Sequence, residues 1–545
     1  MQDRIHIGDQ PLQQALGPFL TGLDTLEEKI SAVESALTGE AGKFWREELG
    51  KWTVRMVPAE LLVPEVHGHW RPLVHDAMLF VVSRLSASRL APKIVEQIGL
   101  PPDTPPEVRL LRFIAKVPGL QKIGQVLARN RNLDPRVRRA LIKLENGISD
   151  MSIAEMQAII CEQLDSQIKA YGIEVEPVIL SEASVSAVVG FTWRNPETGR
   201  RERGVFKILK PHIPSCYAED MKILGQLARH LARKHKTKGT RLGGLAETLT
   251  EIRLLLEHEV DFRREQATLA GALNRYRSIP GVRVPRLIPL LSTPTITALT
   301  LERGKKVTEV RVRPAKLRAR VAERLAEALI AAPAFSLDKD SMFHADPHAG
   351  NVLYDRRRDE LVILDWALTE RLTREQRKSI VLMVMMMVLR DADGLVSAIA
   401  KLCQVRSAYE REEMRIIRAH VEGRLNELTL TQIPGPVDAM ELLDEIAFEG
   451  IRFPAALLMF RKAFFTLDGV LEDIAGTEVR LDRVMARYAL AHWQDVLGSL
   501  LTLFSLRDWI TLDWSALTLS SRLLTSELQR RLRVLAGLTP VADAA

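Results

Sequence analysis

The chain has 545 residues, and its 76 lysines and arginines against 69 aspartates and glutamates give a net charge of +7. A chain of this length can bury a large core and predicts about two to four domains. Its 46% hydrophobic content is ordinary globular composition. The small basic excess is compatible with anionic lipid or nucleotide as a partner and does not favour a nucleic-acid-binding protein.

The cysteines and the apolar runs indicate the redox environment of the chain and its relation to membranes. Cys161, Cys216 and Cys403 are far apart and odd in number, which predicts no disulfide framework and favours a reducing environment. The longest apolar run, IVLMVMMMVL at 380–389, is ten residues long, whereas a membrane-spanning helix needs about 20. We expect a buried core helix there, and a cytoplasmic protein with no transmembrane segment and at most peripheral membrane contact.

The first part of the chain predicts helices, because apolar residues recur at helical spacing to about residue 100. The segment PPDTPPE at 101–107 is a predicted boundary, since prolines stop helices. In the next helical segment, LQKIGQVL, Lys122 and Gln125 are three residues apart and therefore project from the same helical face.

A β-hairpin follows the helices. VVGFTW at 188–193 and RGVFKILK at 203–210 flank the turn signal NPETG. Lys207 lies in the middle of the second strand, where a buried charge needs a partner unless the side chain reaches water. A kinase carries at this place the lysine that contacts the α- and β-phosphates of ATP.

A long helical stretch is predicted from about 218 to 277, and it carries the carboxylates Glu257, Glu259, Asp261 and Glu265. A kinase helix of this kind supplies the glutamate that pairs with the strand lysine. The runs VRVPRLIPLL and TITALTLE then predict two paired strands, and LTLERG at 299–304 predicts a hinge whose backbone would meet a purine.

The stretch 343–367, FHADPHAGNVLYDRRRDELVILDWA, predicts a polar loop that runs into the short apolar strand LVILD. Asp346 and Asn351 are five residues apart, as in the kinase catalytic loop, where the aspartate receives the hydroxyl proton and the asparagine binds Mg²⁺. Asp365 follows the strand at the place of the main Mg²⁺ ligand of a kinase. An amphipathic helix is predicted before this stretch, at 314–332, and helices after it.

Two other interpretations of this loop stay open. It could be a solvated polar turn. Alternatively His344, Asp346 and His348, which share one face of an extended segment, could bind iron or zinc. A metal site of that kind explains neither Asn351 nor Asp365.

The order of these parts is kinase-like, and the details resemble the UbiB/AarF atypical kinase-like family over roughly residues 110–475. The K-x-G-Q motif of that family is matched by LQKIGQVL and its Ala-rich loop by SEASVSA at 181–187. Its E-x-D pair is matched by EVDFRRE and its H-x-D-P-H-x-G-N loop by HADPHAGN.

The resemblance implies an α+β, bilobal protein-kinase-like fold with a small antiparallel β-sheet N-lobe, a helical C-lobe and extra N-terminal helices. The expected segments are a helical extension (1–105), a K-x-G-Q helical extension (106–175), an N-lobe (176–310), a C-lobe (311–480) and a helical C-terminal tail (481–545).

The resemblance also implies the roles of individual residues and the ligands. We expect Asp346, Lys207 and Glu265 to be catalytic, and Asn351 and Asp365 to bind Mg²⁺. The residues expected to bind ATP or ADP are Ala183, Ser184, Val185, Lys207, Glu302, Asn351 and Asp365. Lys122 and Gln125 are expected to face Glu259 and Asp261 and to restrain activity. The implied process is isoprenoid-quinone (ubiquinone) biosynthesis, with isoprenoid lipids or quinone-biosynthesis proteins as further partners.

Two departures from the family pattern support alternatives. Glu182 would repel a triphosphate unless its side chain points away, so the sequence leaves open whether the chain prefers ATP or ADP. Asp365-Trp366-Ala367 lacks the glycine of D-F-G, and a D-W pair is common in small-molecule phosphotransferases of the aminoglycoside and choline kinase type, the second hypothesis. The third is a nucleotide-binding pseudokinase that acts as a scaffold.

Overall fold

The computed structural model describes residues 20–492, with gaps at 57, 64, 66–67, 69–70, 116, 129–134, 143–150, 235–252, 404–409 and 430–432, and also residues 494 and 515. The chain divides into two compact units. The first unit comprises Met1–Ala267 and Arg286–Leu301, and the second comprises Thr268–Pro285 and Glu302–Ala545. The five predicted segments stay predictions.

The first unit begins with helices whose ends follow from the sequence. Thr25 accepts a hydrogen bond from the Glu28 N–H and starts α2 (Leu26–Thr38) with a capping box. Prolines separate α6 (Ala87–Gly99) from α7 (Pro106–Ile114), as predicted. The other N-terminal helices are α3 (Gly42–Met56), α4 (Ala59–Leu62), α5 (Arg71–Arg84), α8 (Pro118–Ala128) and α9 (Pro135–Ile142).

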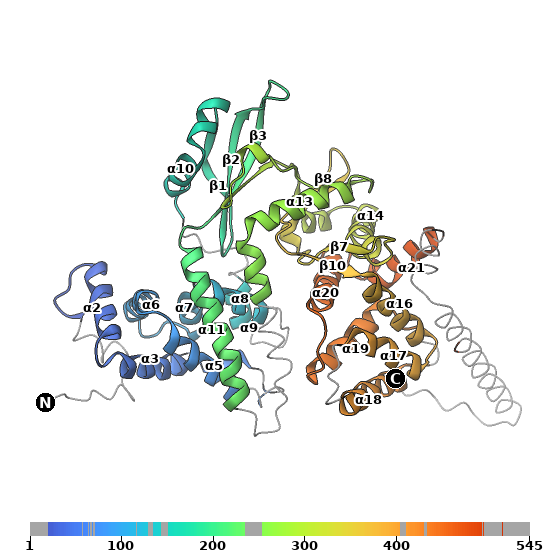
Figure 1. Cartoon of the computed structure of the whole chain (residues 1–545), viewed down its shortest axis with the longest axis horizontal. Coiled ribbons are helices and arrows are strands. Elements are labelled where there is room, and N and C mark those ends of the chain that lie inside the picture. Colours follow the sequence, from blue (N-terminus) through green and yellow to red (C-terminus); the bar gives the residue numbers. More distant parts are fainter. Residues whose placement is uncertain are drawn as a thin grey trace, which may run out of the picture. The chain divides into compact units, whose positions relative to one another are not determined.

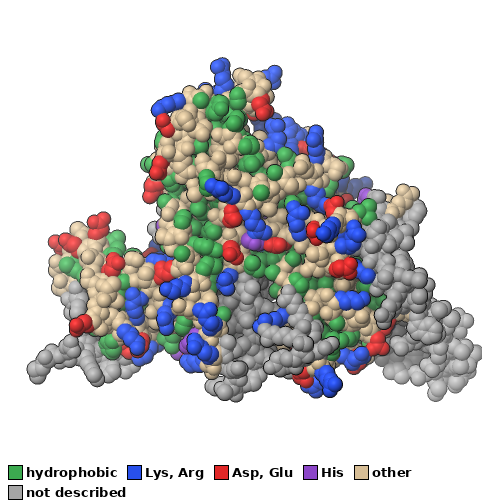
Figure 2. Space-filling model, viewed as in Figure 1, with side chains coloured by type: hydrophobic (Ala, Val, Ile, Leu, Met, Phe, Trp, Pro, Cys, Tyr) green, Lys and Arg blue, Asp and Glu red, His purple; other side chains and the backbone are tan. Residues whose placement is uncertain are grey.

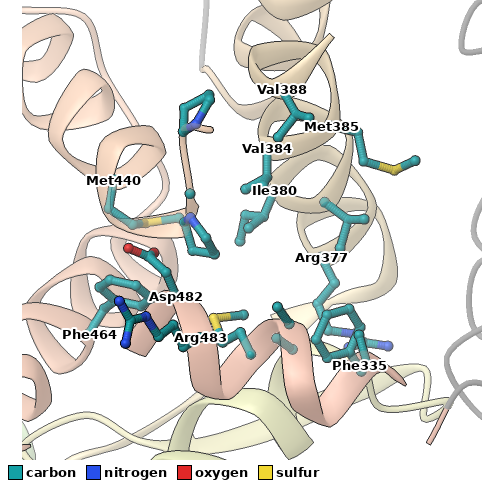
Figure 3. A pocket seen from close by; sticks show the side chains of 18 of the residues that line it. Phe335, Arg377, Ile380, Val384, Met385, Val388, Met440, Phe464, Asp482 and Arg483 are labelled. Atoms are coloured by element: carbon teal, nitrogen blue, oxygen red, sulfur yellow. The ribbon is translucent and has the colours of Figure 1, made fainter. Parts of the chain in front are cut away.

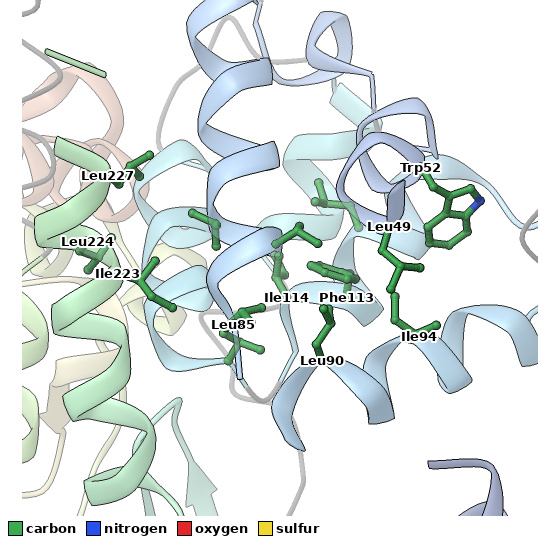
Figure 4. Close-up of a cluster of buried hydrophobic side chains, with 14 of the residues drawn as sticks. Leu49, Trp52, Leu85, Leu90, Ile94, Phe113, Ile114, Ile223, Leu224 and Leu227 are labelled. Carbon is green, nitrogen blue, oxygen red and sulfur yellow. The ribbon is translucent and has the colours of Figure 1, made fainter. Parts of the chain in front are cut away.

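A hydrophobic core joins these N-terminal helices to α11 (Ile213–Lys234) (Figure 4). Leu90 of α6 and Phe113 of α7 belong to the same buried cluster as Ile223 and Leu224 of α11. Burial of each such side chain contributes about 1.5–3 kcal/mol. The N-terminal helices and α11 therefore stabilise one another.

A four-stranded antiparallel sheet of order β1-β2-β3-β5 packs against α10 (Ile153–Tyr171) (Figure 1). Its strands are β1 (Glu174–Glu182), β2 (Ser186–Arg194), β3 (Arg201–Leu209) and β5 (Ile296–Thr300). The predicted hairpin is confirmed as β2 and β3, whereas β1 was not predicted. Phe206 and Ile208 pack in one core with Met156 of α10. Because side chains alternate along a strand, Lys207 projects from the opposite face of the sheet.

The prediction of one helical stretch from about 218 to 277 is wrong, because the helix is interrupted at Asp261. After α11 the described chain resumes as a helix at 253–260, which ends at Asp261. Helix α13 (Phe262–Tyr276) follows at once, and its residues from Thr268 onward belong to the second unit. The Asp261 side chain accepts a hydrogen bond from the Arg264 N–H at 2.9 Å, which starts a new helix rather than extending the old one.

The second unit contains two small sheets. One has the order β4-β9-β8-β6, with β4 (Val282–Arg283), β6 (Lys305–Lys306), β8 (Val352–Asp355) and β9 (Glu360–Ile363). The other pairs β7 (Asp340–His344) with β10 (Thr369–Thr373). The prediction that 282–291 pairs throughout with 295–302 is wrong. Only Leu287 bridges to Leu299 there, and β4 pairs in parallel with β9 instead.

Helices make up most of the second unit. Around the sheets lie η3 (Val307–Val312), α14 (Ala315–Ala326), the π-helical η4 (Glu327–Ala331), α15 (Ala332–Ala334) and η5 (Ala349–Asn351). Then follow α16 (Arg374–Val388), α17 (Ala392–Leu402), α18 (Glu410–Glu427), α19 (Pro436–Phe448), α20 (Ala455–Ala475), η6 (Gly476–Glu478) and α21 (Leu481–Ala491). The 3₁₀ turn η2 (Pro289–Leu291) belongs to the first unit.

The apolar run at 380–389 forms the end of α16 and is a core helix on one side only. Ile380, Met383 and Met387 are buried, as predicted. Val384 and Val388, however, line an apolar cavity of about 470 Å³, to which α19 and α21 also contribute (Figure 3).

No helix among the described residues is long and apolar enough to cross a membrane. Acidic and basic side chains are interspersed over the face shown in Figure 2, in keeping with the small net charge.

Candidate active site

The first unit pairs the predicted strand lysine with the predicted helix glutamate. Lys207 Nζ of β3 lies 2.7 Å from Glu265 Oε1 in the first turn of α13, and their side chains are 12% and 4% exposed. The ammonium also lies 5.6 Å from the centre of the Phe262 ring, a cation–π contact. The ion pair that the kinase-like resemblance implies is therefore formed, and its catalytic role stays a prediction.

The predicted nucleotide loop is a short, tightly held turn between β1 and β2. The Ala183 N–H donates to the Ser186 carbonyl at 2.8 Å, and the Lys210 N–H donates to the Val185 carbonyl at 3.0 Å. Ser184 and Val185 are buried, and Val185 packs with Phe262 in a small apolar cluster. The turn is therefore anchored on both sides, unlike a freely moving glycine-rich loop.

Glu182 precedes this turn and carries a counter-ion that the sequence did not predict. Its Oε1 lies 2.9 Å from Lys210 Nζ, with side chains 8% and 1% exposed, and accepts a hydrogen bond from the Met151 N–H at 3.2 Å. The neighbouring ammonium offsets the negative charge, so the expected repulsion of a phosphate group is reduced.

The K-x-G-Q helix contributes one of its two predicted contacts. Lys122 of α8 forms a buried ion pair with Glu259 in the helix at 253–260. The side chain of Gln125 lies outside the described residues. Asp261, predicted to face the same helix, instead caps α13 and is exposed.

The start of α8 is held against α11 by residues that no motif indicated. The Gly119 N–H donates to Asp220 Oδ2 at 2.6 Å, and Asp220 Oδ1 lies 2.7 Å from Arg89 Nη1. A Cβ at position 119 would lie 2.9 Å from Asp220 Oδ2, so a larger residue there would displace the carboxylate. Burial raises the pKa of Asp220, against the opposing effect of Arg89. This buried contact fixes the helix that carries Lys122.

In the second unit, His344 at the end of β7 organises the predicted catalytic loop. It is fully buried, its Nδ1 accepts a hydrogen bond from the Asp346 N–H at 3.2 Å, and its Nε2 lies 3.0 Å from the Leu364 carbonyl. Burial lowers the pKa of His344, and a neutral ring with the proton on Nε2 suits both contacts. Both ring nitrogens are therefore engaged within the protein. Among the described residues no three His, Cys, Asp or Glu side chains form a metal-binding group, which removes support from the iron or zinc interpretation.

Asp346 follows in the loop and lies between two basic side chains. Its Oδ1 is 3.3 Å from Lys462 Nζ, and its Oδ2 is 4.0 Å from His348 Nε2. Lys462 belongs to α20, more than 100 residues after the loop, and was not predicted. The only sequence signal was a lysine within the apolar run LLMFRKAFF.

The two residues predicted to bind Mg²⁺ lie on adjacent segments. Asn351 Nδ2 donates to the Asp346 carbonyl at 3.2 Å, and the Leu364 N–H donates to the Asn351 carbonyl at 2.8 Å, which aligns the loop with the residue before Asp365. Oxygen donors from an amide and a carboxylate suit a hard cation such as Mg²⁺. The donor chemistry therefore fits the predicted ion.

Asp365 has an unusual backbone. Its φ is +53°, in the left-handed region that residues other than glycine seldom adopt. The next residue, Trp366, is 1% exposed, donates from Nε1 to the Ile363 carbonyl at 3.1 Å, and accepts on its carbonyl from the Thr268 and Thr369 hydroxyls. These contacts hold the turn in place.

Glu302, predicted to bind nucleotide at the hinge, has its side chain engaged elsewhere. Its Oε2 lies 2.8 Å from Arg283 Nε, and the same guanidinium reaches Glu360 at 2.6 Å. Any nucleotide contact at this position is therefore left to the backbone.

The mixed α+β architecture, the Lys207–Glu265 pair and the Asp346–Asn351 loop define a kinase-like protein. Residues 143–399 match the model of the ABC1 atypical kinase-like domain. The chain thus carries an ABC1 atypical kinase-like domain, and both the predicted fold class and the predicted UbiB/AarF kinase-like family are confirmed.

Several relatives are similar over longer stretches. An uncharacterized protein of Synechocystis is 26% identical over 65% of this chain and 59% of its own length. Protein ACTIVITY OF BC1 COMPLEX KINASE 7, chloroplastic, of Arabidopsis thaliana is 24% identical over 68% of this chain and 52% of its own length. The Probable protein kinase UbiB of Xanthomonas oryzae is 28% identical over 47% of this chain and 46% of its own length. The chain thus spans about half the length of the curated relatives it matches.

Proposed function

We propose that the chain binds an adenine nucleotide with Mg²⁺ and acts as an atypical kinase or ATPase. The observation that carries this proposal is the buried ion pair between Lys207 and Glu265. A lysine that lies between the buried Phe206 and Ile208 of a strand and is fixed by a glutamate on a separate helix suits contact with phosphate oxygens. An edge lysine that merely reaches water would not need a buried partner.

The roles of the other residues follow from this proposal. Lys207 contacts the α- and β-phosphates, and Asp346 accepts the proton of the attacking hydroxyl, from an acceptor molecule or from water. As the new O–P bond forms at the γ-phosphorus, the bond to the bridging oxygen breaks and ADP leaves with its electron pair. Mg²⁺, held by Asn351 and Asp365, would supply positive charge against the phosphate oxygens.

The process that the activity serves is the finer part of the proposal. Relatives named Probable protein kinase UbiB and the resemblance to the UbiB/AarF family support a role in isoprenoid-quinone or related lipid biosynthesis. Isoprenoid lipids or quinone-biosynthesis proteins are the proposed partners, and the buried Lys122–Glu259 pair is the proposed restraint on protein phosphorylation.

The test is thermal stability of the full chain with MgATP, with MgADP, with each nucleotide plus a chelator, and in buffer, for wild type and Asp365→Asn. We expect a Mg²⁺-dependent rise in Tm for wild type that the variant loses. No shift with either nucleotide in wild type would refute nucleotide binding and would leave a scaffold without nucleotide as the leading interpretation.

A second candidate is a small-molecule phosphotransferase, favoured by the Asp365-Trp366 pair and its fixed turn. The two differ in the acceptor. Release of ADP that rises several-fold with a small amino alcohol or aminoglycoside, and not with membranes or protein, would favour the phosphotransferase over the ABC1-type activity.

A further inference from the structure

The second unit places a lysine against the aspartate of the catalytic loop from a helix that no kinase motif includes. Lys462 lies beyond residues 143–399, the part that matches the family model. Its Nζ is 3.3 Å from Asp346 Oδ1, and the two side chains are only 8% and 12% exposed. The contact is therefore buried and direct.

Packing of α20 fixes the position of this lysine. The preceding Phe460 stacks edge-on against Phe343 of β7 with ring centres 5.2 Å apart, and both rings are buried. Ala463 and Phe464 on the other side are also buried. Because β7 leads directly into the loop, the same contact that anchors α20 sets the distance between Lys462 and Asp346.

Stability alone does not account for a lysine at this position. A buried ion pair is often no more stabilising than apolar side chains of the same size, because both charges lose their hydration. A methionine would fill the same space within this apolar helix. The adjacent Arg461, in contrast, ties α20 to α19 through Asp444 at 2.6 Å, so helix packing already has its own ion pair.

We propose that Lys462 is a positioning residue for phosphoryl transfer, which holds the Asp346 carboxylate in one rotamer and supplies a fixed positive charge beside the reacting groups. This inference rests on the proposed function. A held carboxylate keeps the acceptor hydroxyl aligned with the γ-phosphorus, and a nearby cation stabilises the charge that the transferred oxygens carry. Arginine could replace lysine in this role, whereas methionine could not.

The experiment compares wild type, Lys462→Met, Lys462→Arg and the exposed control Lys401→Met by MgATP turnover and by calorimetric binding of MgATP. We expect Lys462→Met to lower kcat by about 10- to 100-fold while its Kd for MgATP stays unchanged. Lys462→Arg should restore most of kcat, and the control should match wild type. In an Asp346→Asn background, the methionine substitution should lower kcat by a smaller factor than it does in wild type, because only the fixed charge and no longer the positioning of a carboxylate is lost.

The failures of the inference and of the proposed function are distinguishable. A wild-type chain that neither binds nor turns over MgATP overturns the proposed function and the inference with it. A wild-type chain that does both, with Lys462→Met equal to it, overturns the inference alone. Loss of kcat together with MgATP binding and Tm in Lys462→Met, without rescue by arginine, would also overturn it in favour of a structural role.

Discussion

The pair between Lys207 and Glu265 allows its structural and nucleotide-binding roles to be separated. Both side chains are almost completely buried and lie 2.7 Å apart. Replacing Lys207 by methionine leaves a buried carboxylate without this partner, and we expect a loss of about 3–5 kcal/mol in the free energy of unfolding. Replacing both residues, as Lys207→Met with Glu265→Leu, removes both charges, so the double variant should lie within about 1 kcal/mol of wild type.

Binding should respond differently. The double variant should fold and yet show no detectable affinity for MgATP, because the ammonium that contacts the phosphates is gone. Stability is measured by urea denaturation that is monitored by hydrogen exchange in peptides of β2 and β3. Binding of MgATP is measured by calorimetric titration. Arg201→Met on the same strand, whose side chain is 55% exposed, is the control and should leave both quantities nearly unchanged. Undiminished MgATP affinity in the double variant would refute the role of Lys207, and a single variant as stable as wild type would refute the energetic argument.

Three further predictions follow from the same site and its surroundings. Lys122→Met should raise MgATP hydrolysis or autophosphorylation several-fold by releasing Glu259, and an unchanged rate in both assays would contradict the restraint proposed for this pair. Asp365→Asn should abolish the Mg²⁺ dependence of nucleotide binding, and a Mg²⁺ titration identical to wild type would exclude it as a ligand. Burial, and to a smaller extent the charge of Arg264, lowers the pKa of His258 from 6.5 to about 4. As the solution is acidified, this histidine therefore takes up a proton in the unfolded chain at a higher pH than in the folded chain. Stability should therefore fall by about 2–3 kcal/mol between pH 6.5 and pH 4, a slope that His258→Gln should flatten in urea denaturation at each pH.

Local patterns made much of the site predictable. Lys207 was predicted because a charge lies between Phe206 and Ile208 in a strand, and Glu265 was chosen among the carboxylates of the next helical stretch through the family resemblance. Asp346, Asn351 and Asp365 were found by their spacing. Each of these signals lies within a short stretch of sequence, whereas the contact between Lys207 and Glu265 joins two stretches and was predicted from the order of the kinase parts.

The contacts that sequence reasoning missed connect distant segments. The sequence drew attention to the charge of Glu182 but not to Lys210, and the pairing of β1 with β2 and of β2 with β3 brings the two charges together. Lys462 reaches Asp346 because aromatic packing places α20 against β7. The break at Asp261 was also missed, because an aspartate can lie on a helix face or cap the next helix, and the neighbouring carboxylates favour neither.

The core that α11 shares with the N-terminal helices determines how the chain can be shortened. A chain that begins at residue 106 would retain every kinase-like motif. It would nevertheless lose the helices before that residue, which share one core with Ile223, Leu224 and Leu227, and would uncover part of these side chains (Figure 4). Such an apolar stripe favours aggregation. The truncation would also remove Arg89, which pairs with Asp220, and Asp220 in turn holds the first turn of α8. Activity recorded from the shortened chain would therefore describe a K-x-G-Q helix that has lost its support, and enzymology of this protein should begin with the N-terminal helices in place.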